Sequence, residues 1–175
     1  MSLSDPRPAN DAERIAVLRQ LRLLDTLPEQ VYDDLAFLAS TICGTPISLV
    51  SLVDAERQWF KARIGVEYAE TPRSEAFCAH AILTPDEVMT VSDAREDGRF
   101  VDNPHVTGAP YVRFYAGAPI VTDDGAALGT VCAIDTKPRT IDARQSYALK
   151  ALARVAASLF QLRARTFAAE ETLPR

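Results

Sequence analysis

The sequence predicts an α+β fold in which an antiparallel sheet lies between helices at the two ends of the chain. Two apolar runs, residues 114–121 and 127–135, flank the turn residues Asp124-Gly125, a pattern typical of a β-hairpin. Apolar residues recur at helical spacing near both ends of the chain. Because short turns join most of the expected strands, we expect an antiparallel sheet and assign the chain to the α+β class.

Small residues lie inside both strands of this hairpin. Ala116, Gly117 and Ala118 belong to the first strand, and Gly129 belongs to the second. Small residues in a strand let another backbone or a ligand approach closely. The hairpin therefore predicts a hollow over one part of the sheet, which favours a ligand-binding cavity over a catalytic site.

The N-terminal part of the sequence predicts a leader followed by two helices. Residues 1–10 hold two prolines and several polar residues and are expected to form a flexible leader. Asn10 or Asp11 is a suitable cap for a helix that ends near Leu24. Pro28 suits the first turn of a second helix. The expected inner face of the second helix consists of Val31, Leu35, Leu38, Ala39 and Ile42.

The middle of the sequence predicts a second hairpin. Residues 47–53 are apolar apart from two serines, so we expect a strand that is buried on both faces. A turn over residues 54–57 joins it to a strand over residues 58–64.

The next stretch is less regular. We expect a loop over residues 65–73, a short helix capped by Ser74 and extending through Leu83, and a short strand over residues 88–91. Residues 93–110 contain two glycines and two prolines. An irregular loop of that length in a compact domain is usually functional or acts as a lid.

The last predicted element is a helix from Asp142 to about Thr166, followed by a polar tail over residues 166–175. With no repeat or linker in the sequence, we expect a single domain over residues 11–165. The final helix has an apolar side that can pack on the sheet or on another helix. This side consists of Ala148, Leu149, Leu152, Val155, Ala156, Leu159 and Leu162.

Composition narrows the classes of partner and the cellular compartment. Lys and Arg total 19 while Asp and Glu total 24, a formal net charge of −5, which makes nucleic acid and anionic membranes poor partners. No run reaches the roughly 18 apolar residues of a membrane span, and the N-terminus lacks the apolar core of a signal peptide. Cys43, Cys78 and Cys132 cannot all pair with one another, which favours a cytoplasmic location.

Cys78 and His80 are the first candidates for a reactive or binding site. Residues two positions apart on a helix do not face each other, which argues against a nucleophilic pair. Cys78 is either a core thiol or a reactive, ligand-facing one. His80 either makes a structural or pocket-lining hydrogen bond or contacts a ligand directly. His105 is the only other histidine and no Cys-x-x-Cys spacing occurs, so we expect no metal site.

Arginines and aromatic residues extend the candidate set. Arg73 and Arg113 can each bind a carboxylate or phosphate through two parallel hydrogen bonds, or they can form ion pairs that anchor the loop to the sheet. The acidic partners considered for such pairs are Asp93, Asp102 and Glu70. Trp59 and Tyr115 are suited to line a cavity for a flat ligand or to pack beneath a helix. The expected ligand-binding set is Trp59, Arg73, Cys78, His80, Asp93, Arg113 and Tyr115.

Eight short motifs are spread over the chain. They are Leu24-Asp25-Thr26 with Pro28-Glu29, Ser48–Asp54, Arg57–Lys61, Glu70–Arg73, Phe77–Ile82, Arg99–Pro104, Arg113–Pro119 and Leu128–Asp135. Together they resemble the GAF domain, specifically the branch found ahead of bacterial sensor histidine kinases and diguanylate cyclases. The resemblance extends over nearly all of residues 11–162.

The resemblance implies a PAS-like fold with a central antiparallel sheet of five or six strands. The N- and C-terminal helices are expected on one face and a loop-covered ligand pocket on the other. It further implies a sensory or regulatory domain of bacterial signal transduction that binds a small molecule and relays the change through its terminal helices. The implied partners are a second copy of the chain, contacted through the first and last helices, and a signalling output domain in the same or another chain. No cofactor is identified.

Branches of the GAF family with other activities differ from this sequence at their key motifs. The branch that reduces free methionine sulfoxide has a loop cysteine in an Ala-Cys-Asp context, and none occurs between Asp93 and Tyr111. Phytochrome-like members attach bilin through a cysteine in the same loop, where this chain has His105 alone. The Asn-Lys-Phe-Asp-Glu signature of cyclic-nucleotide members is also missing. We therefore expect a chain that is not an enzyme, with a reductase-like enzyme or a purely structural dimerisation module as alternatives.

Overall fold

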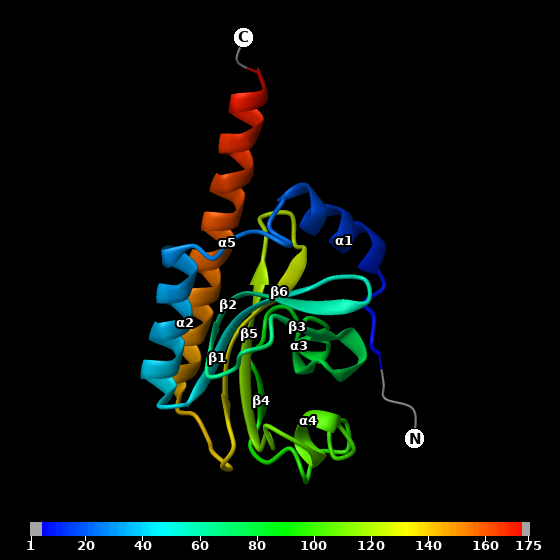
Figure 1. The fold of residues 1–175 in the computed structure, drawn as a ribbon, viewed down its shortest axis with the longest axis vertical. Coiled ribbons are helices and arrows are strands. Elements are labelled where there is room, and N and C mark those ends of the chain that lie inside the picture. The colour runs from blue at the N-terminus through cyan, green and yellow to red at the C-terminus, as the bar shows by residue number, and fades with distance from the viewer. Residues whose placement is uncertain (1–4, 173–175) are drawn as a thin grey trace.

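A six-stranded sheet forms the centre of the protein in a computed structural model that describes residues 5–172 (Figure 1). The strands are β1 (Ile47–Val53), β2 (Arg57–Ile64), β3 (Glu70–Pro72), β4 (Met89–Val91), β5 (Phe114–Val121) and β6 (Ala127–Asp135). Their order across the sheet is β3-β2-β1-β6-β5-β4, and every neighbouring pair is antiparallel. The predicted α+β class and antiparallel sheet are confirmed.

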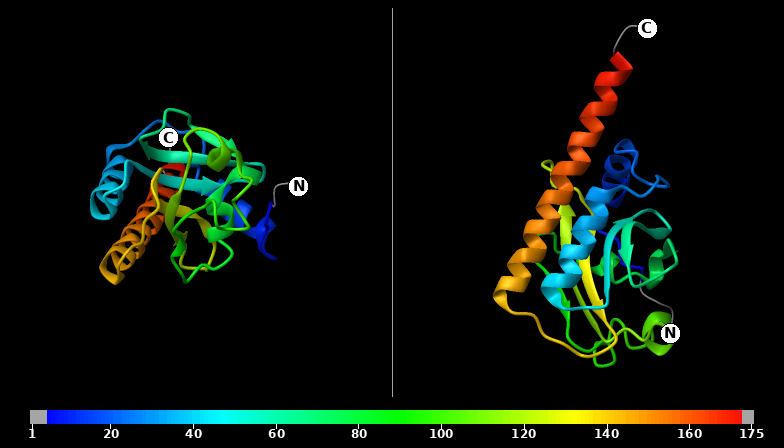
Figure 2. Two further views of the ribbon diagram at one scale, coloured as in Figure 1. Left: turned by 90° about the horizontal axis from the view of Figure 1, so that it is seen from below. Right: turned by 60° about the vertical axis from the view of Figure 1, so that its left-hand side comes forward.

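Helices lie on both sides of the sheet, with the long ones on one face (Figures 1 and 2). Helices α2 (Gln30–Cys43) and α5 (Ala143–Thr172) cover that face, and α1 (Asp11–Gln20) packs near β6. The short helices η1 (Arg73–Glu75), α3 (Phe77–Ala81) and α4 (Pro104–Thr107) lie on the opposite side.

Each face of the sheet carries its own apolar core because successive strand side chains point in opposite directions. Phe114, Ala116 and Ala118 of β5 belong to the core beneath α2 and α5. Tyr115, between them in the sequence, belongs to the core on the opposite face. We call these the helix face and the cavity face.

The N-terminal helices differ from their predicted limits and orientation. Helix α1 ends at Gln20, not near Leu24, because the chain turns there through residues with positive φ, Arg22 and Asp25. Helix α2 begins at Gln30 and buries a different side from the one expected. Its buried residues are Tyr32, Leu35, Ala36, Ala39 and Cys43.

The orientation of α2 follows from its aromatic residue. The Tyr32 ring packs against the Phe160 ring with 5.3 Å between centroids, and this contact turns Val31, Leu38 and Ile42 outward. The prediction that these three residues face the core is wrong, because the large aromatic ring buries more apolar area than any of their aliphatic side chains.

Helix α5 is longer than predicted. It continues to Thr172, so the expected polar tail from residue 166 is helical as far as the described residues extend, and residues 173–175 lie outside them. Leu149, Leu152 and Ala156 are buried as expected, while Val155 and Leu162 are exposed.

Short elements occur in stretches expected to be irregular. Strand β3 lies in the predicted loop over residues 65–73, η1 begins at the last residue of that loop, and α4 lies in the stretch over residues 93–110. The backbone at Ala76 begins α3 with no side-chain cap, so Ser74 is not the cap that the sequence indicated. Of the predicted leader, residues 1–4 lie outside the described part, while Asp5 and Pro6 contact the buried Arg73 side chain.

Within residues 5–172, no helix combines the length and the apolar composition that a membrane crossing needs.

Candidate functional site

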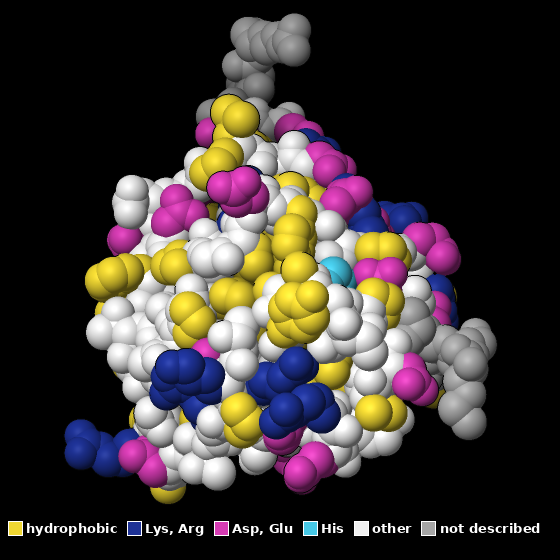
Figure 3. Space-filling model, turned by 60° about the horizontal axis from the view of Figure 1, so that its bottom comes forward, with side chains coloured by type: hydrophobic (Ala, Val, Ile, Leu, Met, Phe, Trp, Pro, Cys, Tyr) yellow, Lys and Arg dark blue, Asp and Glu magenta, His cyan; other side chains and the backbone are white. Residues whose placement is uncertain are grey.

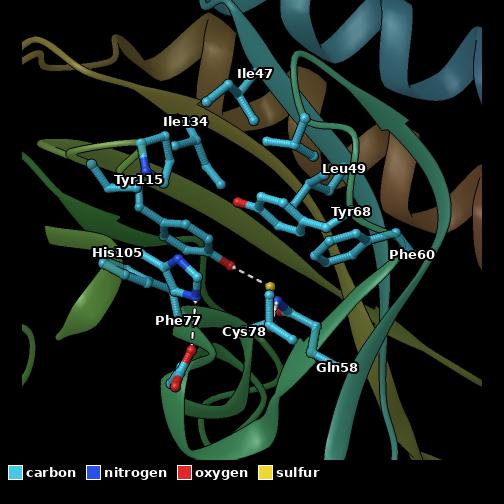
Figure 4. A pocket seen from close by; sticks show the side chains of 15 residues that line it. Ile47, Leu49, Gln58, Phe60, Tyr68, Phe77, Cys78, His105, Tyr115 and Ile134 are labelled. Carbon is cyan, nitrogen blue, oxygen red and sulfur yellow. Dashed lines mark hydrogen bonds and ion pairs between the residues drawn. The ribbon is translucent and has the colours of Figure 1, made fainter. Parts of the chain in front are cut away.

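A small cavity lies on the cavity face of the sheet (Figure 4). Its base is apolar and comes from Ile47, Leu49 and Ile134 of β1 and β6. Phe60 and Tyr68 form one wall, and Phe77, Cys78, His105 and Tyr115 enclose the opposite side. The free volume is about 40 Å³, enough for a few water-sized molecules.

The outer surface near α4 is apolar around the region of this cavity. Figure 3 views the end of the molecule where α4 lies and shows apolar side chains gathered across the middle of the surface, with Lys and Arg side chains below them. At the cavity, His105 Nε2 lies 3.0 Å from Glu75 Oε2. This pair joins α4 to η1, so two short elements are held together over the cavity.

The side-chain oxygen of Gln58, a residue that lines the cavity, lacks a hydrogen-bond partner within residues 5–172. The Gln58 side chain is 6% exposed, and its Nε2 donates to Thr71 Oγ1 at 3.2 Å. Its Oε1 is buried and accepts no hydrogen bond from the described residues. A buried acceptor without a donor costs free energy, so the cavity is suited to a small molecule that carries an O–H or N–H group.

Three hydroxyl groups surround the sulfur atom of Cys78. Ser51 Oγ donates to Cys78 Sγ at 3.1 Å and Tyr115 OH donates to it at 3.3 Å. Thr130 Oγ1 lies 3.0 Å from the same sulfur. These residues come from β1, β5 and β6, so the sheet holds the hydroxyl groups and α3 places the sulfur over them.

The hydroxyl groups change the acidity of this thiol. Burial raises the pKa of Cys78, but hydrogen bonds from Cys132, Ser51, Thr130 and Tyr115 outweigh burial and lower the pKa to about 7. Burial raises the pKa of Cys132 and of Tyr115, so both remain protonated donors. The arrangement favours a thiolate at Cys78.

Gly117 makes room for the Tyr115 ring. A Cβ atom at Gly117 would lie 2.1 Å from the Tyr115 hydroxyl oxygen. Gly129 allows a close approach of strands, since a Cβ there would lie 1.8 Å from the Ser51 carbonyl oxygen. Ala116 and Ala118 pack in the core of the helix face. The prediction that these small residues leave a hollow for a ligand is wrong, because the protein itself fills the space.

Of the seven residues expected at the ligand site, Cys78 and Tyr115 lie at the cavity. Trp59 instead packs in the core of the helix face, because β2 turns its side chain to that side. His80 lies beside the Phe100 ring, with 4.8 Å between centroids; burial, reinforced by Arg99, lowers its pKa.

The charged candidates make structural contacts away from the cavity. Arg73 is 1% exposed and donates two hydrogen bonds of 3.0 Å to the Asp11 carboxylate. Its partner is therefore neither Asp93 nor the other acidic residues expected. Asp93 accepts hydrogen bonds from Arg95, which lower the pKa of Asp93 to about 2. Arg113 donates to the Val106 carbonyl oxygen at 2.9 Å and so supports α4.

Several residues at the site were not expected from the sequence. Gln58 and Phe60 line the cavity, and Ser51 and Thr130 contact the Cys78 sulfur. All four lie in motifs that indicated the family but suggested no role in binding. The signal available for Ser51 was its position as a polar residue in an otherwise apolar strand. No group of three His, Cys, Asp or Glu side chains within residues 5–172 is arranged to hold a metal ion.

Comparison with protein families assigns the chain. The model of the GAF domain matches residues 10–160. The chain belongs to the GAF-domain family. The resemblance found in the sequence is thereby confirmed, together with the fold that it implied.

Solved structures share the fold of this GAF domain. The GAF domain of Acinetobacter phosphoenolpyruvate-protein phosphotransferase has a TM-score of 0.63 at 12% identity and covers 87% of this chain and 93% of that one. Type II free methionine-R-sulfoxide reductase from Thermoplasma acidophilum has a TM-score of 0.60 at 14% identity, with coverage of 75% and 89%. At such identities the likeness shows the fold alone.

A curated relative changes one expectation about activity. This GAF domain is 46% identical over 134 residues to a cyclic di-GMP phosphodiesterase of Pseudomonas aeruginosa, a match that covers 77% of this chain and 23% of that protein. The expectation that the chain is not an enzyme is corrected by this finding, because the relative is named as an enzyme. The chain corresponds to less than a quarter of the length of that enzyme.

Proposed function

We propose that this chain is a sensory or regulatory GAF domain of bacterial signal transduction that controls cyclic di-GMP hydrolysis by a phosphodiesterase in the same or another chain. The observation that carries the proposal is the 46% identity to part of a cyclic di-GMP phosphodiesterase. Free Cys43, Cys78 and Cys132 agree with a cytoplasmic location for this activity.

The two faces of the sheet supply a physical route for such control. Tyr115 closes the cavity on one face, and its neighbours Phe114 and Ala116 pack in the core beneath α5 on the other. A molecule that moves Tyr115 therefore also changes the packing of β5 against α5. Rigid strands with well-packed side chains transmit such shifts because protein interiors have few voids.

The outer sides of α2 and α5 support a second copy of the chain as a partner. Val155 and Leu162 are exposed on α5 and line a shallow groove with Leu159. Val31 and Leu38 are exposed on α2. An apolar surface of this kind marks an interaction site, and we propose a homodimer there. Because Leu18 and Leu21 of α1 are buried within the chain itself, the proposed interface uses α2 in place of the first helix.

Sedimentation velocity tests the dimer. We expect the 19.2 kDa chain to sediment as a dimer at micromolar concentration, and the double substitution Val155→Glu with Leu162→Glu to give a monomer. The matched control is Leu27→Glu, since Leu27 is 84% exposed and lies outside α2 and α5. A wild-type monomer at these concentrations would exclude the interface.

A chimaera tests the regulatory role. The matching part of the Pseudomonas phosphodiesterase is replaced by this chain, and cyclic di-GMP hydrolysis is measured for the chimaera with Ile134→Phe, which fills the cavity. We expect this substitution to change the rate severalfold, while Leu83→Phe, at an exposed site, leaves the rate unchanged. Equal rates for the two variants in an active chimaera would contradict control through the cavity.

A further inference from the structure

We propose that Cys78 is a site of oxidation by hydrogen peroxide, with Cys132 as the second thiol that converts the oxidised form to a disulfide. The inference stands independently of the proposed control of phosphodiesterase activity. It rests on the cavity that reaches the sulfur, on an unpartnered polar group in that cavity, and on the hydroxyl groups around the sulfur.

The size of the cavity selects a small reactant. Cys78 is 1% exposed but lines the cavity, so a molecule reaches its sulfur from there. A volume of about 40 Å³ accommodates hydrogen peroxide, which has two heavy atoms.

The unpartnered oxygen of Gln58 provides a place for that reactant. Gln58 Oε1 is buried at the cavity and accepts no hydrogen bond from the described residues. Hydrogen peroxide carries two O–H donors, one of which can bind this oxygen. The neighbouring walls include the apolar rings of Phe60 and Phe77, so a hydrogen bond to this oxygen would orient the molecule.

The hydroxyl groups make the sulfur a nucleophile. Hydrogen bonds from Ser51, Tyr115 and Thr130 favour the thiolate of Cys78, and a thiolate is the reactive form of cysteine. Cys43 is an internal comparison: burial raises the pKa of this thiol to about 11, and none of the described residues donates a hydrogen bond to its sulfur.

The chemistry proceeds in two balanced steps. The Cys78 thiolate attacks one peroxide oxygen, the O–O bond breaks, and the departing hydroxide takes a proton to become water, which leaves a sulfenic acid on Cys78. The Cys132 sulfur then attacks the sulfenic sulfur, and the displaced hydroxide leaves as water with the proton of the Cys132 thiol. Peroxide is reduced to water and two thiols are oxidised to one disulfide.

The positions of the two thiols support the second step. Cys78 of α3 and Cys132 of β6 pack in the same core on the cavity face, and Cys132 lies two residues along β6 from Thr130, whose hydroxyl contacts the Cys78 sulfur. A disulfide between them would tie α3 to the sheet. Oxidation would thereby fix the cover of the cavity.

Mass spectrometry of the intact chain treated with stoichiometric hydrogen peroxide tests the proposal. We expect Cys78 to be oxidised at least about tenfold faster than Cys43, because its thiolate is favoured. In the wild type the product lacks two hydrogen atoms and contains a Cys78–Cys132 peptide link. In Cys132→Ser, the sulfenic acid persists, so the intact chain gains the mass of one oxygen atom on Cys78.

Two variants test whether hydrogen bonds activate the Cys78 thiol, even if one of the variants fails to fold. Tyr115→Phe keeps the ring and removes one donor, so we expect oxidation of Cys78 to slow by about fivefold, the value of one hydrogen bond. Thr130→Val is the second test in case the first variant unfolds, and Cys43→Ser is the control that leaves the Cys78 rate unchanged. Equal oxidation of Cys78 and Cys43 in the folded wild-type chain, or an unchanged Cys78 rate in folded Tyr115→Phe, would overturn the proposal.

Discussion

The two faces of the sheet use the same kinds of residue for different purposes. On the helix face, Cys43 and Phe160 pack among apolar side chains without a polar partner. On the cavity face, Cys78 meets three hydroxyl groups and a cavity. A closed apolar core stabilises the fold, whereas a core with buried polar groups and free volume can also bind a small molecule and activate a thiol. The contrast teaches that burial alone does not distinguish a structural cysteine from a reactive one.

The largest expected effect is a loss of stability caused by a substitution in the core of the helix face. Phe160→Ala removes a ring that is fully buried between α2 and the sheet and should lower the free energy of unfolding by about 3–5 kcal/mol. Urea denaturation measures this loss. Tyr147→Ala on the same helix is the control, because Tyr147 is 67% exposed, and a change of more than about 0.5 kcal/mol there would contradict the assignment.

The next effect concerns the edge where α1 meets η1. Asp11→Ala leaves the buried guanidinium groups of Arg14 and Arg73 without their carboxylate and should cost about 3 kcal/mol. Glu13→Ala, on the exposed side of α1, is the matched control for urea denaturation.

The same carboxylate predicts a dependence on pH. Burial raises the pKa of Asp11, but hydrogen bonds from Arg73 and Arg14 outweigh burial and lower it below 3.8. A lowered folded-state pKa gives stability that is present above the unfolded value and lost as the pH falls through the folded value. The wild type should therefore lose stability more steeply in acid than Asp11→Asn does, and parallel curves would refute this explanation.

A smaller loss of stability tests whether the Tyr115 ring occupies the space above Gly117. Gly117→Ala places a methyl group against the Tyr115 ring and should cost about 1–3 kcal/mol. In a Tyr115→Ala background the same substitution should be nearly neutral, because the ring no longer occupies the space. A double-mutant cycle measured by thermal unfolding gives this coupling, and simple additivity would show that the ring is not the obstacle.

The last prediction compares the two thiols directly. The folded-state pKa of Cys43 is raised from 9.0 to about 11, so its stabilising contribution is complete below about pH 9 and is lost as the pH rises toward 11. The Cys78 pKa is lowered to about 7, so its contribution is present above about pH 9 and is lost as the pH falls toward 7. Urea denaturation of Cys43→Ser and Cys78→Ser across this range should reveal slopes of opposite sign.

The sequence predicted the architecture better than the site, for a physical reason. Strands such as residues 47–53 and 127–135 follow from local apolar pattern and turn chemistry, and the structure places them within those limits. Motifs covering most of the chain indicated the family, which the match over residues 10–160 confirms. These signals are local or are collected along the whole chain.

The candidate site depends on contacts between residues far apart in the sequence. Arg73 was recognised as a bidentate donor, but its partner Asp11 lies 62 residues away. The pairing of Ser51 with Thr130 depends on the register between β1 and β6, which the sequence alone did not provide. Gly117 was interpreted as open space because the position of the Tyr115 ring above it is a tertiary feature.

The length of α5 has a mechanical consequence. Phe160 is the last residue of this helix that is fully buried, and residues 161–172 continue past the sheet (Figure 2), an overhang of about 18 Å at the usual rise per residue. A tilt of about 5° at the pivot displaces the tip by roughly 1.5 Å by the geometry of a rod of that length. A tilt of α5 where it packs on β5 is therefore carried to the far end of the helix, where residues 161–172 project beyond the sheet.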